Sequence, residues 1–256
     1  MFLSEPTLIL SDEIRDPRVH RTIVQVIGLG AHALNEISAA SFVSKTHLPA
    51  YLQRLQELRL VERRLPATVP PGEQQRSRQG RYHLSDPFFR FYFRFIAPVQ
   101  DDLNYQPELV LPRIQQGLRA FVGQTAWEDL ARDWVRWAGA ARTLPWRPQV
   151  VGSHWSRSVQ VDVVAIDWQT RQILLGECKW GDDAVSRTVV RELIGTKAPL
   201  MLQELPQGGQ GWRVTYALFA RAGLTEAASQ ELAAHQGIAV DFQRLMHDLA
   251  HEDEDA

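Results

Sequence analysis

The sequence predicts an α/β (α+β) protein of two domains: a small helical domain with a two-stranded hairpin, followed by a mixed sheet flanked by helices. Three observations lead to this prediction. Apolar residues recur at helical spacing over residues 20–65, two strand-like apolar runs occupy residues 158–179, and further strand-like runs then alternate with helical ones. A chain of 256 residues with 45% hydrophobic residues has enough apolar surface to form a core in each domain.

Charge divides the chain in the same way. Residues 1–98, the expected first domain, contain 13 Lys and Arg against 9 Asp and Glu, a balance of 13 − 9 = +4. The other residues contain 15 against 21, a balance of 15 − 21 = −6. We expect the second domain at residues 99–248 and a disordered acidic tail at 249–256. The net charge of −2 argues against a uniformly basic coat for nucleic acid, so any contact with a polyanion must be local.

The chain carries no sign of export or of a membrane anchor. Its one cysteine, Cys178, rules out an intramolecular disulfide and fits a reducing compartment. No apolar run is long enough to cross a bilayer, and the first residues lack the basic region of a secretory signal. We therefore expect a cytoplasmic protein that has no membrane contact.

Three short helices are expected in the first domain. The first, "HRTIVQVIGL", places Ile23, Val26 and Ile27 at helical spacing and ends at Gly28 to Gly30, and "ALNEISAAS" forms the second. The third occupies residues 44–64, where Ser44 is the expected N-cap and Pro49 falls in the early turns that tolerate proline. Its expected buried stripe consists of Leu48, Leu52, Leu55 and Leu58.

A hairpin with a basic connection follows these helices. Residues 61–86 predict a strand, a loop rich in Pro, Gly, Gln, Ser and Arg, and a returning strand that begins at residue 81. Three helices and such a hairpin form the outline of a winged helix-turn-helix, a DNA-binding fold. The candidate phosphate contacts on the outer side of the third helix and on the wing are Lys45, Thr46, His47, Gln53, Arg54, Arg76, Arg78 and Arg81. The alternative is that these residues are only the solvated face of a small domain.

The aromatic segment "PFFRFYFRFIAP" comes next. Its five phenylalanines suggest a base-stacking strip as one interpretation. At helical spacing, however, Phe88, Tyr92 and Phe95 face one way, whereas Arg90 and Arg94 face another. This pattern favours an amphipathic helix that holds the two domains together.

The second domain is predicted to begin with a long amphipathic helix at residues 114–140. Its apolar surface consists of Phe121, Trp127, Leu130, Trp134 and Trp137, and Glu128 lies close to the side that packs inward. The Gly-rich segment "QGGQG" lacks the Lys-Ser/Thr ending of a phosphate loop and is expected to be a surface turn. The other expected elements are strands at 158–166 and 172–179, a helix at 186–205, a strand at 212–220, a helix that begins near Thr225 and a strand at 238–242.

The two strands at 158–166 and 172–179 carry the residues that suggest chemistry. If they pair through a tight loop at residues 169 and 170, residues whose numbers sum to 339 lie opposite each other. Asp162 and Glu177 satisfy this condition, because 162 + 177 = 339. Side chains alternate along a strand, so Glu177 and Lys179 share one face and converge with Asp162 on one patch.

Two carboxylates directly opposite each other repel, so a stable patch requires a nearby positive charge. Lys179 supplies part of it, and a hard divalent cation, Mg²⁺ or Mn²⁺, held by Asp162 and Glu177 would supply more. With Lys179 orienting a water or stabilising developing charge, this is the chemistry of phosphodiester hydrolysis. Cys178 points to the opposite face, where a small core residue is expected rather than a nucleophile. The alternative for the patch is an exposed ion pair at a solvated strand end.

The spacing Asp-(14 residues)-Glu-X-Lys, with a helical Glu upstream, is the motif of the PD-(D/E)XK nuclease fold. From "FLSEPTLILSDEIRDP" through "GRYHLSDPFFRFYFRFI" to "VDVVAI" and "GECKW", the chain resembles the C-terminal portion of the archaeal-type AAA ATPases of archaea and bacteria. In that family a winged helix and a PD-(D/E)XK-like domain of unknown function follow a P-loop ATPase module. The resemblance implies a restriction-endonuclease-like sheet with Glu128 as the helical glutamate, Asp162 as the metal-binding aspartate, and Glu177 and Lys179 as the EXK pair.

Two departures from the family pattern matter. The chain contains no G-x-x-x-x-G-K-[ST], so we expect no ATP site in it. Gln160 stands where the family commonly has a glutamate, which implies weaker metal binding if that glutamate assists it.

Three hypotheses follow. The first is a metal-dependent DNA endonuclease, or a descendant of one, that contacts DNA through a winged helix. The second is a non-catalytic DNA-binding or regulatory module that acts with a separate AAA ATPase. The third is a transcription regulator that uses the winged helix alone. The presence of all four residues of the motif favours the first, because a binding module has no need of that set.

Overall fold

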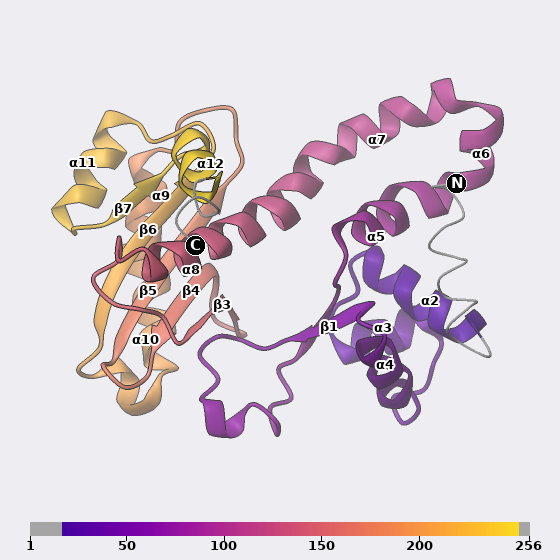
Figure 1. The fold of residues 1–256 in the computed structure, drawn as a ribbon, viewed down its shortest axis with the longest axis horizontal. Helices are drawn as coiled ribbons and strands as arrows, with labels where there is room; N and C mark the ends of the chain where they lie inside the picture. Colours follow the sequence, from indigo (N-terminus) through magenta and orange to yellow (C-terminus); the bar gives the residue numbers. More distant parts are fainter. Residues whose placement is uncertain (1–16, 251–256) are drawn as a thin grey trace. The chain divides into compact units, whose positions relative to one another are not determined.

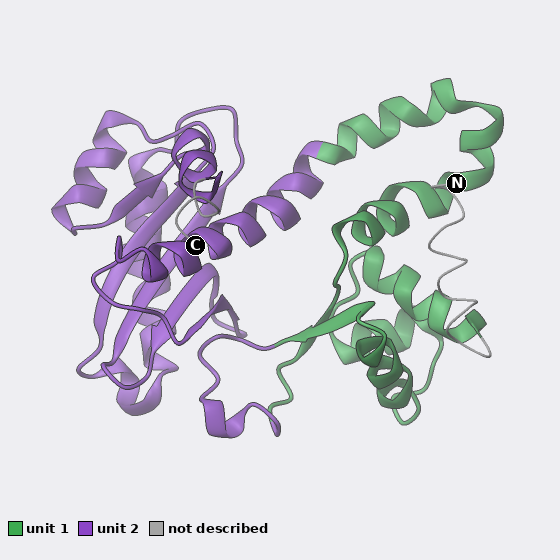
Figure 2. Ribbon diagram, in the orientation of Figure 1, with its two compact units in different colours: residues 1–64, 77–118 green, residues 65–76, 119–256 purple. Residues whose placement is uncertain are grey.

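The computed structural model describes residues 17–250, which form two compact units (Figure 1, Figure 2). Unit 1 contains residues up to 64 and residues 77–118, and unit 2 contains residues 65–76 and those from 119 onward. The predicted mixed α/β class is confirmed, since helices flank a five-stranded mixed sheet, whereas the winged helix-turn-helix stays a prediction. The segment "FLSEPTLILSDEIRDP", up to residue 16, and the acidic tail from residue 251 lie outside the described residues.

Unit 1 contains the three short helices and the hairpin that the sequence predicts. Its elements are α2 (Pro17–Gly28), α3 (Leu34–Ser41), α4 (Leu48–Glu57), β1 (Val61–Arg64), β2 (Arg81–Leu84), α5 (Pro87–Phe91), η2 (Tyr92–Ile96), η3 (Ala97–Val99), α6 (Gln100–Tyr105) and the first part of α7 (Pro107–Val122). The division between the units falls inside α7, between residues 118 and 119. The predicted domain boundary after residue 98 stays a prediction.

The core of unit 1 is the apolar face of α2 and α4. Ile23, Leu48, Leu52 and Leu55 are fully buried, as predicted, whereas Leu58 is only half-buried. The third helix begins at Leu48, four residues later than predicted. Pro49 explains this start, because a residue without an amide donor fits only the first turn of a helix.

The hairpin of β1 and β2 is antiparallel and pairs Val61 with Leu84 and Arg64 with Arg81. Its connection is long and contains a short 3₁₀ helix, η1 (Pro71–Glu73). Residues 65–76 of this connection belong to unit 2, where the Ala67 amide donates to the Ser153 carbonyl at 2.9 Å.

The aromatic segment is helical, as predicted, from α5 through η2 and η3. Asp86 caps it by accepting hydrogen bonds from the amides of Phe88 and Phe89. Its buried residues are Phe89, Tyr92 and Phe93 rather than the predicted Phe88, Tyr92 and Phe95. The π-helical turn η2 changes the angular spacing of the side chains, so a pattern based on 3.6 residues per turn selects a different face.

Unit 2 is a five-stranded sheet with the strand order β3-β4-β5-β6-β7. The β3–β4 and β4–β5 pairs are antiparallel, whereas the β5–β6 and β6–β7 pairs are parallel. The elements after α7 are η4 (Gly123–Trp127), α8 (Glu128–Ala140), β3 (Val150–Trp155), β4 (Gln160–Asp167), β5 (Gln172–Lys179), α9 (Arg187–Glu192), η5 (Leu193–Lys197), α10 (Ala198–Gln203), η6 (Pro206–Gly209), β6 (Arg213–Ala220), α11 (Glu226–Ala234), β7 (Ile238–Val240) and α12 (Phe242–Ala250).

Helices cover both faces of this sheet. Apolar residues of α9, η5, α10 and α11 pack on one face, against side chains such as Ile173 and Leu175 of β5. Residues of η4, α8 and α12 pack on the other, where Trp127 and Trp134 contact Phe219 of β6 within a buried cluster that includes Leu174. Because both faces are covered, a charged side chain in the middle of a strand is costly, and charges are expected at strand ends.

The pairing of β4 with β5 confirms the predicted register. Val163 lies opposite Gly176 and Asp167 opposite Gln172, so the numbers of paired residues sum to 339 (163 + 176 = 339). The loop is four residues long, 168–171, rather than the predicted tight pair, and Asp167 accepts a hydrogen bond from the Gln169 amide within it. No helix among residues 17–250 is long and apolar enough to span a membrane.

Candidate metal-dependent active site

Asp162 lies where β4 leaves its regular pairing with both neighbours. It is one residue beyond the Val163–Gly176 pair, and its Oδ2 accepts a hydrogen bond from the Cys178 amide at 3.0 Å. On the other side of β4, the pairing with β3 is irregular next to Gly152 and His154. A bulge of this kind re-aims a side chain, and here the Asp162 carboxylate reaches the backbone of β5.

Glu177 is buried at the same end of β5, and both of its carboxylate oxygens are in ion pairs. Oε1 lies 2.8 Å from Lys179 Nζ, and Oε2 lies 2.6 Å from Lys197 Nζ. The predicted placement of Glu177 and Lys179 on one face of the strand is therefore confirmed. Burial tends to lower the pKa of Lys179, but the hydrogen bond to Glu177 and the negative charges of Glu177 and Asp162 outweigh burial and raise that pKa.

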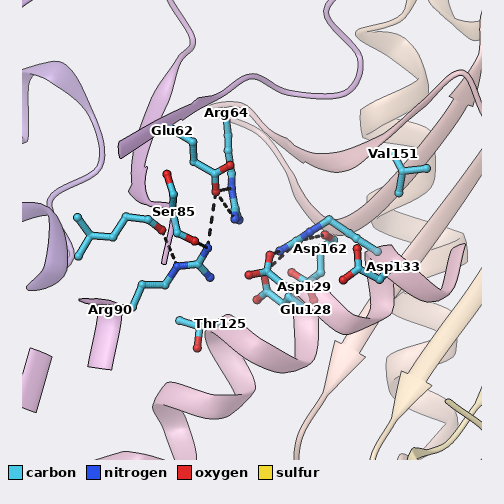
Figure 3. Close-up of polar contacts among 12 residues, drawn as sticks. Glu62, Arg64, Ser85, Arg90, Thr125, Glu128, Asp129, Asp133, Val151 and Asp162 are labelled. Carbon is cyan, nitrogen blue, oxygen red and sulfur yellow. Dashed lines mark hydrogen bonds and ion pairs between the residues drawn. The ribbon is translucent and has the colours of Figure 1, made fainter. Parts of the chain in front are cut away.

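Glu128 reaches this region from α8. Figure 3 shows the side chains of Glu128 and Asp129 close to Asp162, and one guanidinium group bonds to both carboxylates and to the Asp162 main-chain carbonyl. That group belongs to Arg132, whose side chain is only 7% exposed; its NH2 donates to Asp129 Oδ1 at 2.6 Å and its NH1 donates to the Asp162 carbonyl at 3.0 Å. The same NH1 lies 3.5 Å from Glu128 Oε2. Arg132 thus ties the first turn of α8 to β4 at Asp162.

Burial and the repulsion between neighbouring carboxylates raise the pKa of two of these groups, Glu128 and Asp162. Burial first, and then the charge of Asp162, raise the pKa of Glu128 to about 7, although the charge of Arg132 opposes this. Burial and the charge of Glu177 raise the pKa of Asp162, whereas the Cys178 amide and the two lysines act in the opposite direction. Elevated carboxylate pKa values at one end of a sheet are typical of a functional site.

Cys178 has the role expected from the strand alternation. It packs against the cluster of η4, α8 and α12, on the face opposite to Glu177. Burial, together with the charge of Asp162, raises the pKa of its thiol well above the ordinary value. A thiol in that state is a core group rather than a nucleophile.

The sequence analysis did not identify Lys197, Arg132 or Asp129 as parts of this site. A signal for Lys197 was present, because it follows the buried Val190 and Leu193 at positions i+7 and i+4 and so shares their helix face. The signal for Arg132 is its spacing of four residues from Glu128, which is typical of a helical ion pair.

The donor set fits a hard cation of the Mg²⁺ type. Such an ion is commonly held by one or two carboxylates, and waters and substrate phosphates complete its shell. Asp162 and Glu177 provide that number of carboxylates. Among residues 17–250 there is no group of three or more His, Cys, Asp or Glu side chains that would enclose a metal with protein ligands alone.

The candidate nucleic-acid residues are distributed over several exposed segments. Lys45, Thr46 and His47 form an exposed turn before α4, not the first turn of that helix as predicted, because the helix begins at Leu48. Gln53 and Arg54 are exposed on α4, and both contact Glu57.

The candidate wing residues also differ in setting. Arg76 and Arg78 are exposed in the β1–β2 connection, with Arg76 in unit 2. Arg81 is half-buried in β2, and burial lowers the pKa of its guanidinium. Also in unit 1, Arg90 of α5 donates to the Leu84 carbonyl at 2.6 Å, and Figure 3 shows it close to Ser85 and Glu62.

Two comparisons with known proteins bear on this site. The Uncharacterized protein MJECL04 of Methanocaldococcus jannaschii is 28% identical over 191 residues, which are 74% of this chain and 42% of that protein. The chain thus spans about two fifths of the length of this relative. Residues 92–192, which include the four residues of the predicted motif, match the family DUF234, described as archaea bacterial proteins of unknown function.

Proposed function

We propose that this protein is a metal-dependent DNA nuclease of the PD-(D/E)XK type. The observation that carries the proposal is the convergence of Asp162, Glu177 and Lys179 at one end of β4 and β5, with Glu128 interacting with Asp162 from α8. The motif predicts this set from the sequence. A purely structural strand end does not need three buried or half-buried carboxylates.

Each residue has a role that follows from its chemistry. Asp162 and Glu177 would hold the cation, which when bound would supply positive charge to the scissile phosphate and lower the pKa of a water. Lys179, whose ammonium group stays protonated, orients the attacking water and stabilises the charge that develops on the phosphate. Glu128, with a pKa of about 7, completes the site through water and exchanges a proton near neutral pH.

Unit 1 supplies the DNA contacts in this proposal. Its three helices followed by a hairpin are the elements that a winged helix-turn-helix needs, and Lys45, Thr46 and His47 are exposed in the turn before α4. Such contacts are to the phosphate backbone and weaken steeply as salt concentration rises. The resemblance to the C-terminal portion of archaeal-type AAA ATPases suggests a separate ATPase as partner, although that pairing is no part of the catalytic step.

One observation favours a second candidate, a non-catalytic DNA-binding or regulatory module. Both oxygens of Glu177 are already in ion pairs with Lys179 and Lys197, so the site is neutralised without a cation. A descendant of a nuclease that has lost activity would keep such a neutralised cluster for stability.

Cleavage assays separate the two candidates. Supercoiled, linear, single-stranded and branched DNA are incubated with the wild type and with Asp162→Asn and Lys179→Met, in Mg²⁺ and in Mn²⁺. The nuclease proposal predicts cleavage by the wild type and a loss of at least roughly 100-fold in both variants. No cleavage of any substrate, with equal DNA binding by all three proteins, would leave the non-catalytic module.

A further inference from the structure

Glu177 is held by two lysines that come from different elements. Lys179 lies two residues along the same strand, whereas Lys197 lies at the end of η5, on the helical layer that covers this face of the sheet. The Lys197 contact is the shorter of the two, 2.6 Å against 2.8 Å, and its side chain is 22% exposed. With Glu177 only 6% exposed, the two ammonium groups occupy both of its oxygens.

The use of lysine at this site differs from the rest of the chain. The sequence has 25 arginines and only three lysines, and two of those three contact Glu177. An arginine would hold a carboxylate through two fixed hydrogen bonds, whereas an ammonium group is a compact charge on a flexible stem. Lys197 therefore forms a short ion pair with Glu177, and its flexible side chain can break this ion pair and move to another partner.

We propose that Lys197 is a positioning residue that occupies Glu177 in the absence of substrate and transfers to a substrate phosphate when the cation binds. This inference rests on the proposed function. Counted as formal charges, Asp162 and Glu177 contribute two negative charges and Lys179 and Lys197 two positive ones, so a divalent cation meets a site in which Glu177 is already paired. When a phosphate forms an ion pair with Lys197, one carboxylate oxygen of Glu177 becomes available to the cation.

Cation and phosphate should consequently bind cooperatively. By thermodynamic linkage, if phosphate raises the affinity for the cation, the cation raises the affinity for phosphate by the same factor. The site would then hold its cation firmly only when a nucleic-acid phosphate is present, which sets the order of events before cleavage.

Mn²⁺ binding, followed through the electron paramagnetic resonance signal of the free ion, tests this inference without any activity measurement. Mn²⁺ is titrated into the full chain with and without millimolar inorganic phosphate. We expect phosphate to tighten Mn²⁺ binding to the wild type. In Lys197→Met, Mn²⁺ alone should bind roughly 5- to 10-fold more tightly than to the wild type, and phosphate should add little.

Two further variants separate charge at this position from other effects. Arg213→Met removes one positive charge from the exposed start of β6, at the opposite end of the sheet, and should behave as the wild type. Lys197→Arg keeps the charge and should retain weak binding of Mn²⁺ in the absence of phosphate. Thermal unfolding in the presence of a chelator verifies that each variant is folded.

The outcomes distinguish this inference from the proposed function. If Lys197→Met binds Mn²⁺ as the wild type does, with and without phosphate, the role of Lys197 is wrong, and the nuclease proposal is unaffected. If Lys197→Arg behaves as Lys197→Met, charge is not the cause and the inference also fails. If no variant binds Mn²⁺ even with phosphate, the metal site itself is refuted.

Discussion

Replacing Glu128 with glutamine is expected to stabilise unit 2 above pH 7 and to have no such effect below pH 4.5. Burial and the charge of Asp162 raise the pKa of Glu128 from 4.5 to about 7 in the folded protein. Between these pH values the folded protein holds a proton that the unfolded chain has released. Stability therefore falls as the pH rises through this window, because ionisation penalises only the folded state.

The magnitude follows from the two pKa values. One pKa unit corresponds to about 1.4 kcal/mol, so the difference between 4.5 and about 7 corresponds to about 3–4 kcal/mol. The Glu128 side chain is 24% exposed, and solvent screening reduces this value. We therefore expect the glutamine variant to gain about 1–2 kcal/mol of unfolding free energy above pH 7 relative to the wild type. Glutamine keeps an oxygen for Arg132, so the contact between the two side chains need not be lost.

Urea unfolding monitored by tryptophan fluorescence is the assay. All eight tryptophans lie between residues 127 and 212, so the signal reports unit 2. The matched control is Glu226→Gln, at an exposed glutamate of α11, which should show no gain above pH 7. A glutamine variant of Glu128 that has the same stability relative to the wild type at pH 4.5 and pH 8 would refute the reasoning.

Three further perturbations test individual parts of the structure. Arg132→Met should lower the unfolding free energy by about 3–5 kcal/mol, because it leaves the acidic partners of this buried guanidinium without a positive charge. A loss below about 1 kcal/mol in the same urea assay would contradict the stabilising role of Arg132. Phe42 is 94% exposed and has φ +58°, a backbone conformation that glycine adopts without strain. Phe42→Gly should therefore stabilise unit 1 by about 1 kcal/mol, measured by thermal unfolding followed by circular dichroism. Destabilisation would mean that the phenyl ring makes a stabilising contact. Burial lowers the pKa of His154, although the negative charge of Glu204 opposes this shift. The unfolded chain therefore binds the His154 proton more readily than the folded protein does. As a result, the unfolding free energy falls as the pH drops below about 6.5, the ordinary pKa of the side chain. His154→Gln should reduce this loss between pH 7 and pH 5, and an unchanged slope of stability against pH would argue against the assignment.

Much of the candidate site was accessible from the sequence because its geometry is local. The register of β4 and β5 depends on one hairpin, and a mistake of one residue would have moved every apolar side chain to the wrong face. The expected pairing put Asp162 near Glu177, and the hydrogen bond from the Cys178 amide agrees with this. Glu128 was identified because a charged side chain near the buried side of an amphipathic helix is costly unless it has a partner or a function.

Features that depend on tertiary packing were missed or misplaced. No range was predicted for β3 because its residues, "VVGSHW", alternate poorly, and this edge strand is held by its pairing with β4 and by the hydrogen bond from Ala67. The helix α12 follows directly after β7 and was not expected. Lys197 is 18 residues from Lys179 in the chain, so only the packing of η5 on the sheet brings the two together at Glu177.

The measurement that tests the central claim most directly is the location of a bound metal ion by anomalous scattering. Crystals grown with Mn²⁺ and inorganic phosphate are measured near the manganese absorption edge, together with crystals of Asp162→Asn. The account predicts an anomalous peak between the carboxylates of Asp162 and Glu177 in the wild type, and its loss in the variant. A wild-type map with no peak between them, or an equal peak in Asp162→Asn, would contradict the assignment of this site as a metal-dependent nuclease centre.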